Sequence, residues 1–339
     1  MSSISPKKES HLQFMNELDT IPDIEAFKRA NYPQETTNIG YTDTHMHIDN
    51  MEGKKWRVPT QEVISYYLSQ KGIVQAGTIF EEGVSVNKLL NTLEDKEIDC
   101  SIVPFLFVHN PYEIDREKVE YLYTSNLLKG FKLHPVYDNY PLSYDLLHNL
   151  FEISKEYGSL PILMHLDDRK DSMDLTAPHR LDRLIESMIE KDRIVPLILG
   201  HTGAYAHPRL VLYKSKPNPP VLQYWKNQSP ENEANYSRIY LIKHALQLAK
   251  EYPFVYLDSS SCINKIKAKL ISDAVNQFPQ LSRKILLGTD FPVLSQHKKK
   301  KDGSTSFNVG VTVNGQLEAL WNQGLKKEHL LQIASNRIP

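Results

Sequence analysis

The chain has 339 residues, and 40% of them are apolar, which is enough to bury a sizeable hydrophobic core. Its 40 basic and 41 acidic side chains leave a formal net charge of -1 at pH 7. This balance excludes the strongly basic surface of a typical nucleic-acid-binding protein and gives no attraction to an anionic membrane.

Cysteine content and apolar runs indicate the cellular compartment. Cys100 and Cys262 are the two cysteines of the chain, without a C-x-x-C spacing, so a disulfide framework is excluded and a reducing compartment fits. The segment MSSISPKKESHLQF has a basic pair but lacks the apolar stretch of a signal peptide, and no apolar run approaches the roughly 18 residues of a membrane span. We expect a cytoplasmic protein with no membrane or nucleic-acid partner.

A polar lead-in comes first in the chain. Leu12, Met15 and Leu18 are spaced as on one face of a short amphipathic helix. We therefore expect residues 1–38 to form an N-terminal helical extension.

From residue 39 onward, short apolar runs alternate with helix-like segments. Most of these runs are continuously apolar, which is typical of parallel strands covered on both faces. We expect eight strands, at residues 39–48, 72–80, 101–108, 130–135, 160–166, 194–201, 254–260 and 284–292. Eight alternating strands and helices predict a (β/α)8 TIM barrel over residues 39–339.

Two segments interrupt this alternation. Between the sixth and seventh strands the chain is longer than one crossover needs, and we expect a loop insertion at 202–236. On the catalytic face of a barrel this insertion, with Tyr205, Tyr224 and Trp225, would form a lid. After the eighth strand, the lysines at 298–301 indicate a solvated loop.

Polar side chains that can bind metal gather where the predicted strands end, which is where barrel enzymes have their active sites. They are His45, His47, Lys132, His134, His165, His201, Asp258 and Asp290. An unpartnered polar ring at the end of a buried strand is unfavourable, which favours a functional role. Imidazoles and carboxylates without thiolates suit Zn²⁺, Mn²⁺ or Fe²⁺, with a position left open for water.

We predict that His45, His47, His165 and Asp290 bind the metal. Asp290 would also accept the proton of the metal-activated water. His201 is a ligand of a second metal, a catalytic hydrogen-bond donor or a structural histidine at a strand end.

Lys132 lies inside an apolar strand, where a lysine is costly unless it has a partner. It is a carbamylated bridging ligand, a cation for a substrate carboxylate, or a buried lysine paired with an acid. His134 and Tyr205 are weaker candidates for substrate contact, and Asp258 would brace the site.

At these residues the chain resembles the amidohydrolase superfamily, and within it the amidohydrolase-related (type 2) metal-dependent hydrolases. The resemblance covers residues 39–338 and rests on five motifs in the family's order: DTHMHID, GFKLHP, PILMH, LGHTGA and LLGTDFPV. It implies a TIM barrel in which His45, His47, His165 and Asp290 hold a catalytic divalent metal, with His201 at or beside that metal. It also implies that Lys132 is carboxylated and bridges two metals, as in dihydroorotase, although type 2 members often hold one.

The resemblance leaves three activities to weigh. We expect a hydrolase that acts on a C–N or C–O bond of a small molecule, such as a cyclic amide, a lactone or an ester, with one or two Zn²⁺ ions. The alternative is a non-oxidative decarboxylase of a small aromatic or unsaturated acid. A minor alternative is a TatD-type nuclease, which shares the opening motif but carries a glutamate where this chain has Gly288. The sequence leaves a homo-oligomer open.

Overall fold

The computed structural model describes most of the chain from residue 40 onward. The described residues are 40–48, 64, 67–68, 72–81, 84–95, 98–166, 175–204, 236–260, 265–290, 296–299, 305–308 and 313–339. The expected N-terminal helical extension lies outside them, and so does most of the expected insertion, including Tyr205, Tyr224 and Trp225.

Eight parallel strands form one sheet, and their order in the sheet is their order in the chain. The strands are β1 (Tyr41–His47), β2 (Ile73–Phe80), β3 (Ser101–Phe107), β4 (Gly130–Leu133), β5 (Ile162–Met164), β6 (Leu197–Leu199), β7 (Val255–Asp258) and β8 (Ile285–Leu286). The amide of Thr44 donates to the carbonyl of Leu287, and the amide of Asp290 donates to the carbonyl of His45, which brings the last strand against the first. The chain is therefore a (β/α)8 barrel, as predicted.

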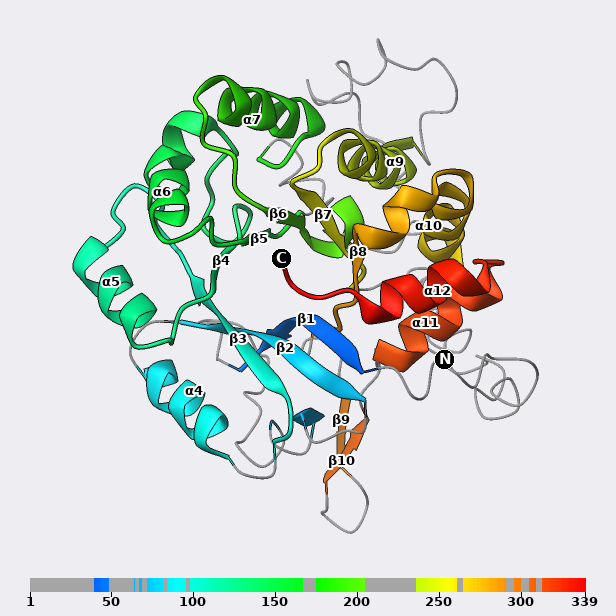
Figure 1. The fold of residues 1–339 in the computed structure, drawn as a ribbon, viewed down its shortest axis with the longest axis horizontal. Helices are drawn as coiled ribbons and strands as arrows, with labels where there is room; N and C mark the ends of the chain where they lie inside the picture. The colour runs from blue at the N-terminus through cyan, green and yellow to red at the C-terminus, as the bar shows by residue number, and fades with distance from the viewer. Residues whose placement is uncertain are drawn as a thin grey trace, which may run out of the picture. The chain divides into compact units, whose positions relative to one another are not determined.

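Helices lie around the outside of these strands (Figure 1). They are α4 (Val84–Glu94), α5 (Arg116–Thr124), α6 (Tyr144–Glu156), α7 (Pro178–Glu190), α9 (Tyr236–Glu251), α10 (Lys265–Gln277), α11 (Val313–Asn322) and α12 (Lys327–Ser335). Helix α6 shows how the sequence sets their limits: the Ser143 hydroxyl accepts a hydrogen bond from the Leu146 amide at its start. Gly158, at a φ of +87°, follows its end. Among the described helices, none has the length and apolar character to cross a membrane.

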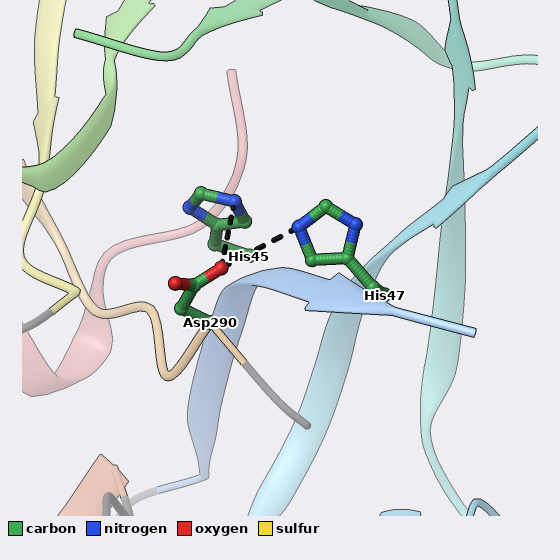
Figure 2. A group of neighbouring side chains, drawn as sticks. All are labelled: His45, His47 and Asp290. Carbon is green, nitrogen blue, oxygen red and sulfur yellow. Dashed lines mark ion pairs between the residues drawn. The ribbon is translucent and has the colours of Figure 1, made fainter. Parts of the chain in front are cut away.

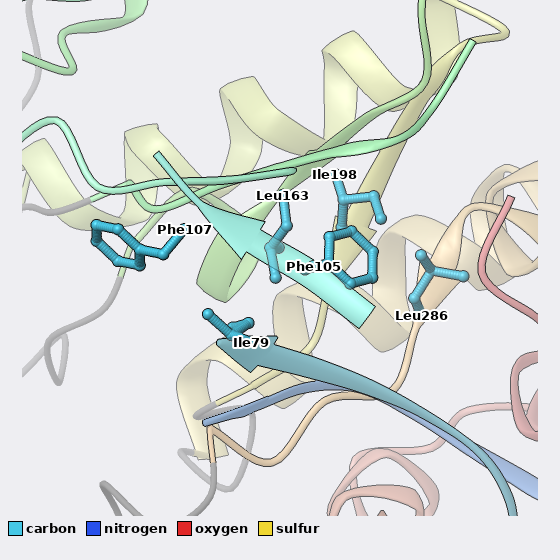
Figure 3. Close-up of a cluster of buried hydrophobic side chains, with 6 residues drawn as sticks. All are labelled: Ile79, Phe105, Phe107, Leu163, Ile198 and Leu286. Atoms are coloured by element: carbon cyan, nitrogen blue, oxygen red, sulfur yellow. The ribbon is translucent and has the colours of Figure 1, made fainter. Parts of the chain in front are cut away.

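The barrel interior is filled by side chains from five strands (Figure 3). They are Ile79, Phe105, Phe107, Leu163, Ile198 and Leu286. Ile338, next to the C-terminus, packs against this cluster, and its amide donates to the Gln75 side chain at 3.0 Å. Since side chains alternate along a strand, the next inward positions beyond this cluster lie at the C-terminal mouth of the barrel. On β5 this position is His165, two residues beyond Leu163, whereas Lys132 on β4 is in register with Phe107 and Leu163 of the cluster itself.

Two short strands outside the barrel change one expectation. β9 (Gln296–Lys299) pairs antiparallel with β10 (Thr305–Asn308), and Lys298 lies opposite Ser306. The predicted loop is therefore wrong for Lys298 and Lys299, because a partner strand follows a few residues later and satisfies their backbone groups. Residues 300 and 301 lie outside the described part of the chain.

Candidate metal centre

Two histidines and one carboxylate converge at the mouth of the barrel (Figure 2). His45 and His47 are two residues apart on β1, so both side chains point into the barrel, and Asp290 follows β8. The Nε2 atoms of both histidines lie 3.4 Å from the same oxygen, Oδ1 of Asp290. All three residues are buried, and their ligand atoms lie within 4.8 Å of one another, close enough to share one metal ion.

Asp258 fixes the orientation of the His45 ring. The Nδ1–H of His45 donates to Oδ2 of Asp258 at 2.8 Å. The same carboxylate accepts from the amide of His201 at 3.2 Å and from the amide of Ser260 at 3.0 Å. A proton held on Nδ1 leaves the lone pair of Nε2 directed at Asp290, which is the tautomer that a metal ligand needs.

His201 lies in an unusual turn directly after β6. The 3-10 turn η2 (Gly200–Gly203) includes His201 at a φ of +55° and Thr202 at +49°, both in the left-handed region. Each such residue costs roughly 1–2 kcal/mol relative to a right-handed conformation. The turn places His201 Nε2 3.0 Å from Nδ1 of His165 and His201 Nδ1 2.7 Å from the Ser260 hydroxyl.

Two of the imidazoles and both carboxylates are in the protonation states that bind metal. Burial lowers the pKa of His47 to about 4 and that of His201 well below its usual range, so both rings are neutral at pH 7. Burial raises the pKa of Asp258, but His45 and the hydrogen bonds from Ser260 outweigh it and hold the pKa at about 2. Burial likewise opposes ionisation of Asp290, and the neighbouring His45 and His47 hold its pKa below the usual value. Neutral imidazoles and ionised carboxylates are the forms that bind metal.

Lys132 reaches the same place from β4. Its side chain is fully buried, and its Nζ lies 3.1 Å from Nε2 of His45. Burial lowers the pKa of Lys132 to about 8, while Asp290 and Asp258 act in the opposite direction. The lysine is thus part of the cluster rather than a remote surface cation.

A second polar layer lies one inward position further along β2, β3 and β4. Its members are Glu81, His109 and His134, each two residues beyond an inward-facing or site residue. The Nδ1–H of His109 donates to Oδ1 of Asp138 at 2.9 Å, and its Nε2 lies 3.8 Å from Oε1 of Glu81. The His134 ring stacks on His165 with 3.7 Å between the ring centroids. This layer faces the mouth beside the metal cluster.

The predicted site residues are thus brought together. His45, His47 and Asp290 form the tightest group, Lys132 contacts His45, and His165 adjoins through its contact with His201. His134 stacks against His165, and Tyr205 lies outside the described residues.

Sequence reasoning gave no role to a buried network behind the cluster. Asp43 accepts from the Tyr67 hydroxyl at 2.6 Å, from the Thr289 amide at 2.9 Å and from the His45 amide at 3.2 Å. It ties β1 to the residues after β8. The position of Asp43 in the DTHMH motif is the one feature of the sequence that could have indicated this role. Nothing in the sequence around Tyr67 and Thr289 indicates that they are its partners.

Gly288 is the second residue whose role needs the three-dimensional structure. A Cβ atom at this position would lie 2.0 Å from Oδ1 of Asp258 and 3.0 Å from Cβ of His45. Any larger residue would therefore displace the carboxylate that orients His45.

Comparison with known proteins shows the fold. No family model and no curated protein matches the sequence. A D-hydantoinase structure has 14% sequence identity and a TM-score of 0.50, over 88% of this chain and 69% of that one. The two share a fold. A dihydroorotase (12% identity, TM-score 0.48, 88% of this chain and 67% of that one) and a dihydropyrimidinase from Brevibacillus agri NCHU1002 (11%, 0.47, 87% and 69%) also match.

Proposed function

We propose that the chain is a member of the amidohydrolase superfamily and a metal-dependent hydrolase of a C–N or C–O bond in a small molecule. One observation carries this proposal: His45, His47 and Asp290 converge, buried, at the C-terminal mouth of a (β/α)8 barrel. The shared fold of a D-hydantoinase supports a cyclic amide as the first substrate class to test.

The donor set fits a divalent metal. It offers two imidazole nitrogens, that of His47 held neutral by burial, and an ionised carboxylate in a buried site, the ligands that suit Zn²⁺ and also Mn²⁺ or Fe²⁺. When bound, such a metal polarises a carbonyl group and makes hydroxide available near neutral pH.

Asp290 is the residue that we assign to proton transfer. One of its oxygens faces both His45 and His47, which leaves the other for a proton taken from water and returned to the leaving group. Asp258 keeps His45 in the correct tautomer from behind.

The hydrogen-bond directions at His201 support a ligand role. The Ser260 hydroxyl donates its single proton to Asp258, so its oxygen accepts from Nδ1–H of His201. With a neutral ring, Nε2 of His201 then carries a lone pair and accepts from His165. This lone pair can bind a metal in place of the hydrogen bond from His165, and Nε2 carries no proton to donate to a developing oxyanion.

The position of Lys132 distinguishes a carbamylated metal ligand from a cation that binds a substrate carboxylate. A protonated ammonium 3.1 Å from His45 Nε2 would repel a divalent cation bound to that nitrogen. A pKa of about 8, lowered by burial, makes the uncharged amine accessible near neutral pH. We therefore favour a carbamate on Lys132, formed when the amine attacks CO2 and releases one proton, over a cation that holds a substrate carboxylate.

Gly288 argues against the nuclease alternative. The glutamate of that alternative has no room beside Asp258, because even a Cβ atom would lie 2.0 Å from its Oδ1. The decarboxylase alternative uses the same ligands, so the experiment has to separate it from the hydrolase.

Elemental analysis of the native protein, followed by a panel of cyclic imides, lactams, lactones and aromatic acids, tests the proposal. We expect bound Zn²⁺, Mn²⁺ or Fe²⁺, ring opening with incorporation of ¹⁸O from water, and loss of turnover with chelator and in Asp290→Asn. Asp273→Asn, at an exposed surface ion pair, is the control. Two metals per chain would support the carbamate; CO2 release without ¹⁸O incorporation would favour the decarboxylase. Turnover that persists after complete metal removal would contradict both.

A further inference from the structure

The feature that the proposed mechanism leaves unexplained is a buried lysine behind the His201 turn. Lys267 lies in the first half of α10, and 1% of its surface is exposed. Among the lysines whose side-chain burial the structure describes, Lys267 and Lys132 are the two that are buried. A lysine in such a place is costly unless its ammonium protons are donated to acceptors, and an apolar side chain of the same length would fill the volume without that cost.

The ammonium group holds the two ends of the turn. Lys267 Nζ donates to the carbonyl of His201 at 2.7 Å and to the carbonyl of Ala204 at 2.6 Å. These carbonyls are three residues apart, and they flank Thr202 and Gly203. One cation therefore bridges the segment in which three successive residues have positive φ.

Other contacts restrain this turn without replacing the lysine. The Thr202 hydroxyl donates to the carbonyl of Asp258 at 2.9 Å, and Gly203 packs so closely that a Cβ atom would lie 2.7 Å from the carbonyl oxygen of Leu241. These contacts hold the middle of the turn. The carbonyl of His201 accepts from the Ala204 amide at 3.2 Å within the turn, and Lys267 ties this carbonyl to helix α10.

We propose that Lys267 is a positioning residue that fixes His201 for metal binding by bridging the carbonyls of His201 and Ala204. The inference rests on the proposed function, in which His201 is a metal ligand. Its role is geometric: the ammonium touches no reacting group and holds an unfavourable backbone conformation in place. Removal of the bridge releases the turn toward ordinary backbone angles and moves the His201 ring away from His165 and Ser260.

The test compares Lys267→Met with Lys269→Met on the same helix. Methionine keeps the length and apolar stem of Lys267 but has no donor, whereas Lys269 is exposed and pairs with Asp273 at the surface. Zn²⁺ affinity is measured by competition with a chromophoric chelator, well below the unfolding temperature of each variant. In parallel, ¹⁵N-labelled histidine spectra of the metal-free proteins report the environment of His201, with His148 on α6 as an internal reference.

We expect Lys267→Met to bind Zn²⁺ at least tenfold more weakly and to shift the His201 ring resonances, while Lys269→Met matches the wild type in both. A folded Lys267→Met protein with unchanged His201 resonances and unchanged affinity would overturn the inference. If Lys267→Met does not fold, Lys267→Gln, which keeps a shorter neutral donor, takes its place under the same criteria. A wild-type protein that binds no metal would contradict the proposed function, and the metal-free spectra would still decide the role of Lys267.

Discussion

Asp258 contacts the Nδ1 side of the His45 ring, away from the position that His45, His47 and Asp290 could share around a metal ion. Its carboxylate accepts from Nδ1–H of His45 and so leaves Nε2 to face that position. Both oxygens of the Asp258 carboxylate accept hydrogen bonds, from His45, His201 and Ser260. In Asp258→Asn an NH2 group replaces one of these oxygens, so a donor then faces another donor. We predict a 10–100-fold loss of Zn²⁺ affinity, the range for groups that orient a metal-binding histidine. Competition titration measures it, and an affinity equal to that of Asp273→Asn would show that Asp258 has no such role.

Gly288 allows this carboxylate to lie where it does. Gly288→Ala places a methyl group 2.0 Å from Oδ1 of Asp258, so the carboxylate or the backbone has to move. We predict a destabilisation of about 1–3 kcal/mol together with a loss of metal binding. Urea unfolding and elemental analysis measure the two effects.

Gly324→Ala is the matched control. Gly324 has a φ of +84° and open space around it, so alanine there strains the backbone without touching the site. We expect this variant to lose about 1 kcal/mol of stability and to keep its metal. A Gly288→Ala protein with full metal content would contradict the steric argument.

At the scale of elements, the site lies on the seam between β1 and β8. Tyr67 donates to Asp43 at 2.6 Å, and Asp43 in turn accepts from Thr289 after β8. Tyr67→Phe leaves this buried carboxylate, whose pKa burial already raises, with one donor fewer. We predict a loss of about 1.5–3 kcal/mol in the free energy of unfolding, the range for a hydrogen bond to a charged group.

The control for this seam is Tyr121→Phe on α5. Tyr121 is 63% exposed, so its hydroxyl is solvated before and after the change. We expect its unfolding free energy in urea to stay within about 0.5 kcal/mol of the wild type. Equal effects of the two substitutions would mean that the hydroxyl of Tyr67 contributes nothing specific to the seam.

Elements and site differ in how far the sequence predicts them. Each predicted strand overlaps an observed one, because a continuous apolar run reports burial on both faces. The observed strands are shorter, as β8 (Ile285–Leu286) shows against the expected 284–292. Strand β8 ends at Leu286, and Asp290, four residues further on, adopts a φ of +57° in the site.

The supporting contacts of the site were beyond prediction for a different reason. Asp43 and Thr289 are 246 residues apart, and Lys267 and the carbonyl of His201 are 66 apart. A local sequence pattern contains no information about such distant pairs. His45 and His47, by contrast, can be recognised from their two-residue spacing on one strand. The wrong loop prediction at Lys298 has a different origin: its partner strand is close in the chain, but both strands are mostly polar and give no apolar pattern.

At the scale of the molecule, the buried histidines make the metal-free protein sensitive to acid. Burial lowers the pKa of His47 in the folded state to about 4, against about 6.5 for an exposed histidine, so the unfolded chain binds its proton first as the pH falls. The contribution of His47 to stability is therefore complete above pH 6.5 and declines between pH 6.5 and 4, by about 3 kcal/mol. His201 acts in the same direction. The contribution of Asp258, with a pKa of about 2, is lost only below about pH 4.

Urea unfolding with chelator at pH 7.5 and pH 5 measures this decline. His47→Gln removes the titrating ring, and we expect its stability to fall less than that of the wild type over the same interval. A wild-type protein whose stability changes between the two pH values by the same amount as His47→Gln would show that burial does not hold His47 neutral.

A metal ion bound by His45, His47 and Asp290, as proposed, would link the first and last strands of the barrel, so its effect would reach the whole fold. His45 and His47 belong to β1 and Asp290 follows β8, and an ion held between them joins the seam at which the sheet closes. A ligand that binds the folded state alone stabilises it by about 2.7 kcal/mol at a free concentration of 100 times its Kd, which raises the Tm of a chain of this size by about 4 °C. We predict this rise for Zn²⁺ or Mn²⁺ added to the metal-free protein, measured by scanning calorimetry, and little for Ca²⁺, which prefers six or more oxygen ligands.

In Asp290→Asn the rise should fall by more than half, because the amide has lost the negative charge that faces both histidines. A Zn²⁺-induced rise of the same size in Asp290→Asn would place the ion elsewhere on the chain and remove the connection between metal binding and barrel closure.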